Sequence, residues 1–214
     1  MNIALFGASG WVGGTILREA LERGHSVTAI VRDPSKITFT HERLSVAAGD
    51  SADAASVASG ARGHEVAAAA IGGRATAQHE VVPASAQALL AGLGQAGVPR
   101  LVWVGGAGSL EVAPGMRLVD TPQFPADYKA EALAQADALE VFRATETPVT
   151  WTVVSPAIMV LPGTRSGRYR SGGDQLLTND KGESSISVED YAAAFVDEIE
   201  KAANPGRRIS VIGA

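Results

Sequence analysis

The stretch Asn2-Ile3-Ala4-Leu5-Phe6-Gly7-Ala8-Ser9-Gly10-Trp11-Val12-Gly13 decides the fold of this chain. Residues 2–6 form a mostly apolar run without polar alternation, which predicts a strand buried on both faces. Residues 11–23 have the spacing of an amphipathic helix. The turn between them has the pattern G-x-x-G-x-x-G, one residue looser than the G-x-G-x-x-G fingerprint of dinucleotide-binding proteins.

The glycines of this turn have separate expected roles. Gly7 permits the sharp turn, Gly10 lets a pyrophosphate approach the backbone, and Gly13 lets the helix pack close to the sheet. The free N–H groups of the first helical turn then face the anion. The alternative is a glycine-rich turn without a ligand, which the strand-turn-helix context disfavours. The sequence therefore predicts a cofactor-binding turn made of Gly7, Ser9, Gly10, Trp11, Val12 and Gly13.

The same alternation of strand and helix continues along the chain. Strands are predicted at residues 26–31, 44–48, 65–71, 100–104, 150–154 and 209–212, and helices at 51–59, 79–96, 125–145 and 188–203. Apolar strands separated by helices predict an α/β fold: a single Rossmann-type domain over residues 1–214, whose doubly wound parallel sheet has helices on both faces. Two irregular stretches, 105–124 and 161–187, follow strand ends, where such sheets bind ligands, and we expect them to form an acceptor pocket.

The end of the second strand indicates which nicotinamide cofactor is bound. NAD-binding sites usually carry an acidic residue there, whereas this strand ends in Arg32. A guanidinium at this place can pair with a 2′-phosphate, so NADP(H) is predicted in preference to NAD(H). The alternative is a surface Arg32 paired with Asp33. Lys36 adds a further positive charge.

Two later turns are expected to contact the cofactor. Asp50 follows the third strand and can supply an adenine contact, although an ordinary turn or helix cap explains it equally well. Ile71, Gly72 and Gly73 end the fourth predicted strand, and the two glycines remove side chains where the cofactor crosses the sheet edge. A plain turn is the competing explanation.

Composition excludes several classes of protein. The 214 residues contain no cysteine, which excludes disulfides and thiolate chemistry, and four scattered histidines without metal-binding spacing, so no metal site is expected. A formal net charge of −5 argues against a nucleic-acid partner. No apolar run approaches a membrane span and no leader precedes the first strand, so we expect a cytoplasmic protein. We expect it to be a monomer or a homodimer.

The chain resembles the atypical short-chain dehydrogenase/reductases, in the NAD(P)H-binding group that contains NmrA-like proteins and proteins proposed to be NADH-flavin reductases. The resemblance covers the whole chain. Beyond the first turn, it rests on Val31-Arg32-Asp33-Pro34, Val104-Gly105-Gly106-Ala107-Gly108-Ser109-Leu110, Trp151-Thr152-Val153-Val154-Ser155-Pro156-Ala157 and Ile186-Ser187-Val188-Glu189-Asp190-Tyr191-Ala192. It implies a Rossmann domain, NAD(P)H binding and reduction of a small-molecule electron acceptor, a flavin (FMN or FAD as substrate) or a quinone.

The resemblance also implies positions for the reacting groups. Ser155, Pro156 and Ala157 resemble the segment that contacts the nicotinamide carboxamide, although a proline that ends a strand explains them too. Ser109 would lie near the nicotinamide or the acceptor and donate a hydrogen bond, and Tyr128 would line the same pocket. The alternatives are a loop serine bonded locally and a tyrosine that packs on the loop. The basic run Arg165, Arg168 and Arg170 is a further candidate for contact with an anionic acceptor such as a flavin phosphate, although a solvated loop explains it at least as well.

One departure from the superfamily pattern limits the chemistry. Its usual proton-transfer pair is a tyrosine with a lysine four residues later. This chain lacks the pair, because no lysine stands four residues after Tyr128, Tyr169 or Tyr191. The residues at those positions are Ala132, Gly173 and Phe195. Reduction of a flavin or quinone needs such a pair least, because hydride goes directly to an electron-poor ring. The sequence thus favours an NAD(P)H-dependent reductase of such an acceptor, with a non-catalytic NADPH-binding sensor of the NmrA type as the alternative; an epimerase would lack its base.

Overall fold

The computed structural model describes residues 1–214 and contains twelve strands and five α-helices. The strands are β1 (Asn2–Phe6), β2 (Ser26–Val31), β3 (Leu44–Ala48), β4 (Val66–Ala69), β5 (Arg100–Val104), β6 (Glu111–Ala113), β7 (Met116–Arg117), β8 (Thr150–Ser155), β9 (Met159–Leu161), β10 (Tyr169–Gly172), β11 (Ser185–Ser187) and β12 (Arg207–Gly213). The helices are α1 (Trp11–Glu22), α2 (Ala54–Ala61), α3 (Val81–Ala96), α4 (Ala126–Ala144) and α5 (Val188–Lys201), with short 3-10 turns η1 (Pro34–Lys36) and η2 (Leu118–Asp120).

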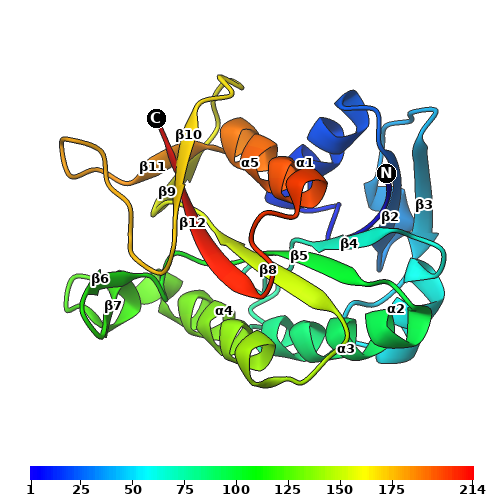
Figure 1. Cartoon of the computed structure of the whole chain (residues 1–214), viewed down its shortest axis with the longest axis horizontal. Helices are drawn as coiled ribbons and strands as arrows, with labels where there is room; N and C mark the ends of the chain where they lie inside the picture. The colour runs from blue at the N-terminus through cyan, green and yellow to red at the C-terminus, as the bar shows by residue number, and fades with distance from the viewer.

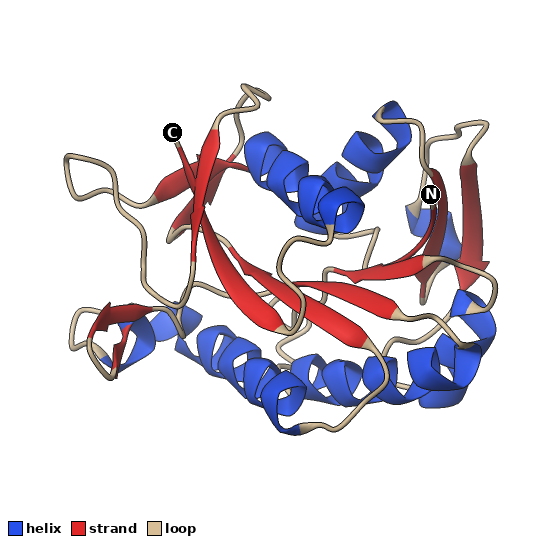
Figure 2. Cartoon of the chain, viewed as in Figure 1, coloured by secondary structure: helices blue, strands red, loops and turns tan.

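Eight of the strands form the central sheet, in the order β10-β12-β8-β5-β4-β1-β2-β3. Helices α1 and α5 cover one face and α2, α3 and α4 cover the other (Figures 1 and 2). The strand order reverses at β1, which pairs with β2 on one side and with β4 on the other, both in parallel. This is the topological switch point at which doubly wound sheets bind ligands. The predicted Rossmann-type α/β fold is confirmed.

The sheet separates two apolar cores. Strand β4 is completely buried, and its alanines let helices approach both faces closely. The core under α3 and α4 contains the few large aromatic side chains: the ring centroid of Trp103 lies 5.3 Å from that of Phe142 in an edge-on arrangement. None of the helices has the combination of length and apolar content that a membrane span requires.

The structure corrects the sequence prediction at the sheet edge and in the two irregular stretches. Strand β10 pairs antiparallel with β12, so the sheet is not wholly parallel. Short strands β6 and β7 lie within 105–124, and β10 and β11 lie within 161–187. Such short, partly polar strands have no apolar periodicity, because they depend on pairing with distant segments. Strand β4 ends at Ala69, so Ile71, Gly72 and Gly73 belong to the following loop.

Strand β10 is fastened to the helices of the adjacent layer through Asp197 of α5. Its carboxylate accepts hydrogen bonds from Arg23 Nη1 at 2.6 Å, the Tyr169 hydroxyl at 2.5 Å and Lys201 Nζ at 2.5 Å. Burial raises the pKa of Asp197, but the hydrogen bonds from Lys201, Tyr169 and Arg23 outweigh it and hold the pKa at about 2. The charged carboxylate therefore stabilises the folded state.

This cluster predicts a loss of stability in acid. An unfolded aspartate titrates near pH 3.9. Because the pKa is lower in the folded state, the contribution of Asp197 is complete above that pH and disappears as the pH falls through about 2. We expect Asp197→Asn to lower the free energy of unfolding by about 1–2 kcal/mol at pH 7, after allowance for solvent screening, and by progressively less towards pH 2. Urea unfolding across this range measures it, with the exposed Asp180→Asn as control; parallel profiles for parent and variant would contradict the assignment.

Candidate functional site

The N-terminus of α1 presents unpaired backbone donors. The N–H groups of Trp11, Val12 and Gly13 have no acceptor within the protein, and no side chain caps the helix at Gly10. The first turn also contains no acidic residue. Unpaired N–H groups and the positive end of the helix dipole together make an anion-binding site.

The three glycines of the turn differ in how much space the surrounding protein leaves for a side chain. Gly7 has φ +81°, and a Cβ there would lie 2.2 Å from the carbonyl oxygen of Ala70. A Cβ on Gly13 would lie 2.2 Å from the carbonyl oxygen of Gly7. A Cβ on Gly10 would meet only that same oxygen, at 3.5 Å. Packing within the protein thus requires Gly7 and Gly13, whereas the space over Gly10 is free for a ligand.

A cavity of about 270 Å³ adjoins this turn. Its lining comprises residues 8–11, Gly14, Thr15, Arg18 and residues 36–39. The Arg18 guanidinium lies 4.5 Å from the ring centroid of Phe39. Arg18 and Lys36 make no hydrogen bond or ion pair through their side chains, so two positive charges without a bonded partner border the cavity beside the anion-binding turn.

Arg32 directly follows β2, at the entrance to η1, and its side chain is exposed and unpaired. Asp33 does not neutralise it. Its carboxylate accepts from the Ser35 N–H at 3.1 Å and the Ser35 hydroxyl at 2.7 Å, and these bonds lower the pKa of Asp33. The surface pair between Arg32 and Asp33, the alternative raised by the sequence, does not form. The sequence prediction did not include Arg18. Its position two turns after Trp11 on α1 was the available signal, because residues seven apart lie on the same face of a helix.

Asp50 forms a local turn after β3. Its carboxylate accepts from the N–H of Ala52 at 2.9 Å, and its own N–H donates to the Ser56 hydroxyl at 2.8 Å. The side chain is exposed. The adenine contact predicted for Asp50 stays a prediction, beside the turn role that the structure gives it.

A second cavity, also about 270 Å³, lies where β5 and β8 end above α4. Its walls are mostly apolar, with Leu118, Phe124, Ile158 and Met159 among them, and four side chains with polar groups also line it. The full lining is Arg74, residues 106–108, Leu118, Phe124, Pro125, Tyr128, Glu131, Ala132, Gln135, Ile158 and Met159. Both cavities therefore lie at the carboxyl edge of the sheet, where open α/β folds bind ligands.

Glu131 connects this cavity to the loop after β4. Its Oε2 accepts from the Gly73 N–H at 3.0 Å and from His79 Nδ1 at 2.8 Å. Gln135, one turn later, donates to the carbonyl of Ile71 at 2.8 Å. The predicted residues 71–73 are thus held against α4 by two side chains that sequence reasoning missed. The helical spacing of Tyr128, Glu131 and Gln135, which places all three on one face, was the available signal.

The structure separates the two residues predicted to contact the acceptor. Tyr128 lines the second cavity, with its ring centroid 4.3 Å from the Arg74 guanidinium. Ser109 does not line it: its hydroxyl accepts from Arg208 Nη1 at 3.2 Å. Arg208 is buried in β12 and pairs with Asp174. Ser109 therefore belongs to a structural contact beside the cavity, and its predicted bond to the acceptor finds no support in the geometry.

The segment Ser155-Pro156-Ala157 begins at the last residue of β8, at the same edge as the second cavity, and Ile158 immediately after it lines that cavity. The Ser155 hydroxyl is buried without a hydrogen-bond partner. The three predicted residues are thus near the cavity, and contact with a nicotinamide carboxamide stays a prediction.

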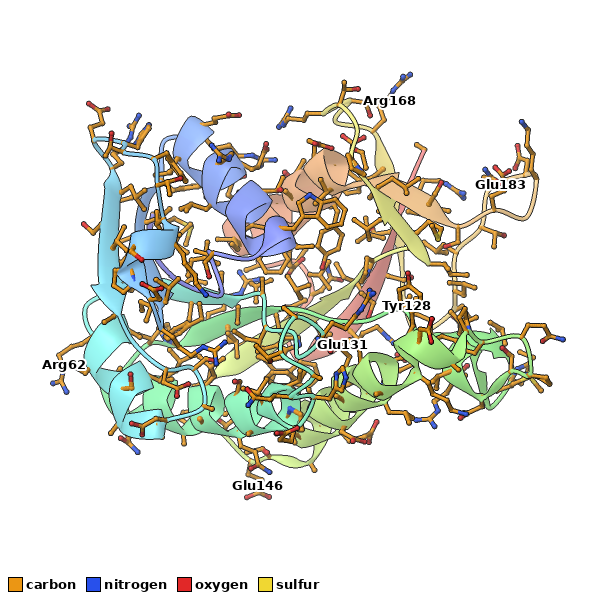
Figure 3. The ribbon with its side chains drawn as sticks, turned by 180° about the vertical axis from the view of Figure 1, so that it is seen from behind. Arg62, Tyr128, Glu131, Glu146, Arg168 and Glu183 are labelled. Carbon is orange, nitrogen blue, oxygen red and sulfur yellow. The ribbon has the colours of Figure 1, made fainter.

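The basic run in the second irregular stretch lies elsewhere. Arg165 Nε pairs with the buried Glu19 of α1 at 2.8 Å, and Arg170 donates to the carbonyl of Thr178. Figure 3 shows Tyr128 and Glu131 on α4, with Arg168 at the opposite side of the molecule. Arg165 thus has a partner within the protein, and no residue of stretch 161–187 lines the second cavity; a contact of the basic run with an acceptor stays a prediction.

Comparison with known proteins agrees with this geometry. The sequence model of a family described as NAD(P)H-binding matches residues 7–202. A crystal structure from Burkholderia pseudomallei, of a protein proposed to be exported, is 44% identical with a TM-score of 0.90, and the match covers 99% of each chain. A Bacteroides thetaiotaomicron protein proposed to be an epimerase is 38% identical with a TM-score of 0.91, over 99% of this chain and 96% of that one.

A third crystal structure, of a Streptococcus pneumoniae TIGR4 protein proposed to be an NADH-flavin reductase, is 34% identical with a TM-score of 0.88 over 100% of both chains. The family match spans nearly the whole chain and includes the glycine turn. Because both the sequence match and the free N–H groups of that turn point to a dinucleotide, the two agree on its ligand. This chain belongs to the NAD(P)H-binding family.

Proposed function

We propose that this protein is an NADPH-dependent oxidoreductase that reduces a flavin or a quinone-like acceptor. The observation that carries the proposal is the second cavity, a mostly apolar pocket formed by α4 and the loops that follow β4, β5 and β8. When bound, NADPH supplies the hydride. The similarity to a protein proposed to be an NADH-flavin reductase supports the same class of reaction.

The residues present fit this cofactor. The N–H groups of Trp11, Val12 and Gly13 are free to bind a pyrophosphate. Arg18, Arg32 and Lys36 would hold a 2′-phosphate, because none of them has a carboxylate partner. NADPH is therefore the cofactor that we propose, in preference to NADH.

The residues of the second cavity have two functions in this proposal. The side chains of Leu118, Phe124 and Ile158 exclude water from the reacting ring. Glu131 and Gln135 fix the loop at residues 71–73, the edge that the nicotinamide must pass. No tyrosine-lysine pair borders the cavity, since Ala132 stands four residues after Tyr128. This favours an acceptor that needs no side-chain base.

The test is NADPH oxidation with and without FMN, riboflavin or a small quinone. Acceptor-dependent oxidation supports the reductase. Tight NADPH binding without oxidation by any of these acceptors would favour the NADPH-binding sensor instead. We also propose a cytoplasmic location and a monomeric or homodimeric state, which fractionation and light scattering can test.

The position of Ser109 gives a prediction about this reaction. Because its hydroxyl bonds to Arg208 and does not line the cavity, Ser109→Ala should lower kcat/KM by less than about threefold, while the loss of one hydrogen bond lowers the free energy of unfolding by about 1 kcal/mol. Parallel rate and urea measurements separate the two effects. A loss of rate above about thirtyfold with unchanged stability would restore Ser109 to the acceptor site.

A further inference from the structure

Arg74 is an unpaired cation at the second cavity. It lies in the loop between β4 and α3, lines the cavity and is exposed. Its guanidinium packs 4.3 Å from the ring centroid of Tyr128, and its side chain makes no hydrogen bond or ion pair. A guanidinium stacked on a ring keeps its N–H donors at its edge, where they are free for a planar anion.

Glu131, the one carboxylate that lines this cavity, makes no ion pair with Arg74. Its oxygens are occupied by the Gly73 N–H, by His79 and, at 3.3 Å, by Gln135 Nε2. Figure 3 shows Glu131 beside Tyr128 on α4. The cavity thus has apolar walls, one carboxylate with its own partners, and one positive charge without a partner.

This combination defines a class of acceptor. Apolar walls that include Phe124, Ile158 and Met159 suit a flat, apolar ring system. A free guanidinium at the cavity suits a phosphate, carboxylate or sulfonate group. We propose that the physiological acceptor is a planar, electron-poor ring that carries an anionic substituent, and that Arg74, held by Tyr128, binds this substituent.

The proposal rests on the proposed reductase function and adds the specificity of its acceptor. In the reaction, the nicotinamide loses a hydride and is oxidised, the ring gains two electrons and that hydrogen, and water supplies the second proton. Arg74 binds the substituent and takes no part in proton transfer. Two chemical sources of the anion, a flavin phosphate and an acidic quinone, share this recognition and are separated by the test.

The test compares pairs of acceptors that differ by one anionic substituent: FMN against riboflavin, and a naphthoquinone sulfonate against naphthoquinone. For Arg74→Ala we expect kcat/KM to fall about ten- to thirtyfold more for the anionic member of a pair than for the neutral one. Tyr128→Ala removes the ring that holds the guanidinium, and should give about a two- to fivefold difference. Discrimination in the flavin pair alone identifies a phosphate as the anion, and discrimination in the quinone pair alone identifies an acidic quinone.

Two control variants remove the same charge elsewhere. Arg62→Ala lies at the end of α2 and Arg168→Ala in the basic run, both distant from Tyr128 in Figure 3. Neither should change the ratio between the members of a pair. Flavin fluorescence titrations in the presence of NADP⁺ give the same comparison without turnover, and Arg74→Ala should weaken binding of FMN by a similar factor.

The possible outcomes test the role of Arg74 separately from the proposed reductase activity. Turnover in which Arg74→Ala affects both members of each pair equally overturns the inference and leaves the reductase intact. The inference is also overturned if Arg168→Ala, and not Arg74→Ala, removes the preference for the anionic acceptor of a pair. NADPH binding with neither turnover nor binding of any of the four acceptors overturns both.

Discussion

The variant Gly10→Val should fold normally and lose NADPH binding. The backbone at Gly10 has φ −79° and ψ 165°, an extended conformation that valine adopts readily. A Cβ there meets only the Gly7 carbonyl oxygen, at 3.5 Å, so the fold tolerates the side chain. The branched methyl groups would fill the space through which a pyrophosphate reaches the free N–H groups of α1. Loss of two charge-assisted hydrogen bonds predicts an affinity lower by at least about a hundredfold.

Calorimetric titration with NADPH and a thermal melt without it test this prediction. The contrasting variant is Gly13→Val, whose Cβ would lie 2.2 Å from the Gly7 carbonyl oxygen and should destabilise the fold itself. Binding by Gly10→Val within about tenfold of the parent protein would mean that the turn is not the pyrophosphate site.

The variant Arg32→Ala should lose most of the preference for NADPH over NADH. Removing an exposed guanidinium from a 2′-phosphate should weaken NADPH binding about tenfold and leave NADH binding almost unchanged, since NADH lacks that phosphate. Arg18→Ala and Lys36→Ala should act in the same direction, because both line the cavity beside the glycine turn, although Arg32 itself does not line it. The preference should also shrink as the salt concentration rises.

Paired titrations with the two cofactors measure this effect, and Arg62→Ala serves as the charge control. Equal affinity of the parent protein for NADPH and NADH would remove the assignment of NADPH. A preference that survives the loss of Arg32, Arg18 and Lys36 together would place the 2′-phosphate elsewhere.

The parts of the fold that local sequence dictates were predictable. Strand β1 and the beginning of α1 at Trp11 agree with the predicted boundaries, because apolar continuity and a glycine turn mark them locally. Strand β10 was not predictable, because its polar residues become a strand only by pairing with β12. Edge strands of this kind depend on contacts that no local pattern encodes.

The candidate site shows the same division. The glycine turn and Arg32 are adjacent to their strands, so the sequence places them. The pairing of Ser109 with Arg208 depends on where β12 enters the sheet, and the stacking of Arg74 on Tyr128 joins a loop to a helix distant in the sequence. Of the contacts around the second cavity, only the position of Tyr128 and Glu131 on one helix face could have been predicted, because their spacing is helical.

The unequal surroundings of the three glycines have an evolutionary consequence. Gly7 and Gly13 are constrained by folding, whereas Gly10 is constrained only by the ligand. A lineage that kept this fold but abandoned the cofactor would therefore be free to replace Gly10 first, with the other two glycines retained. The residue at position 10 would then indicate whether a descendant protein still binds a dinucleotide.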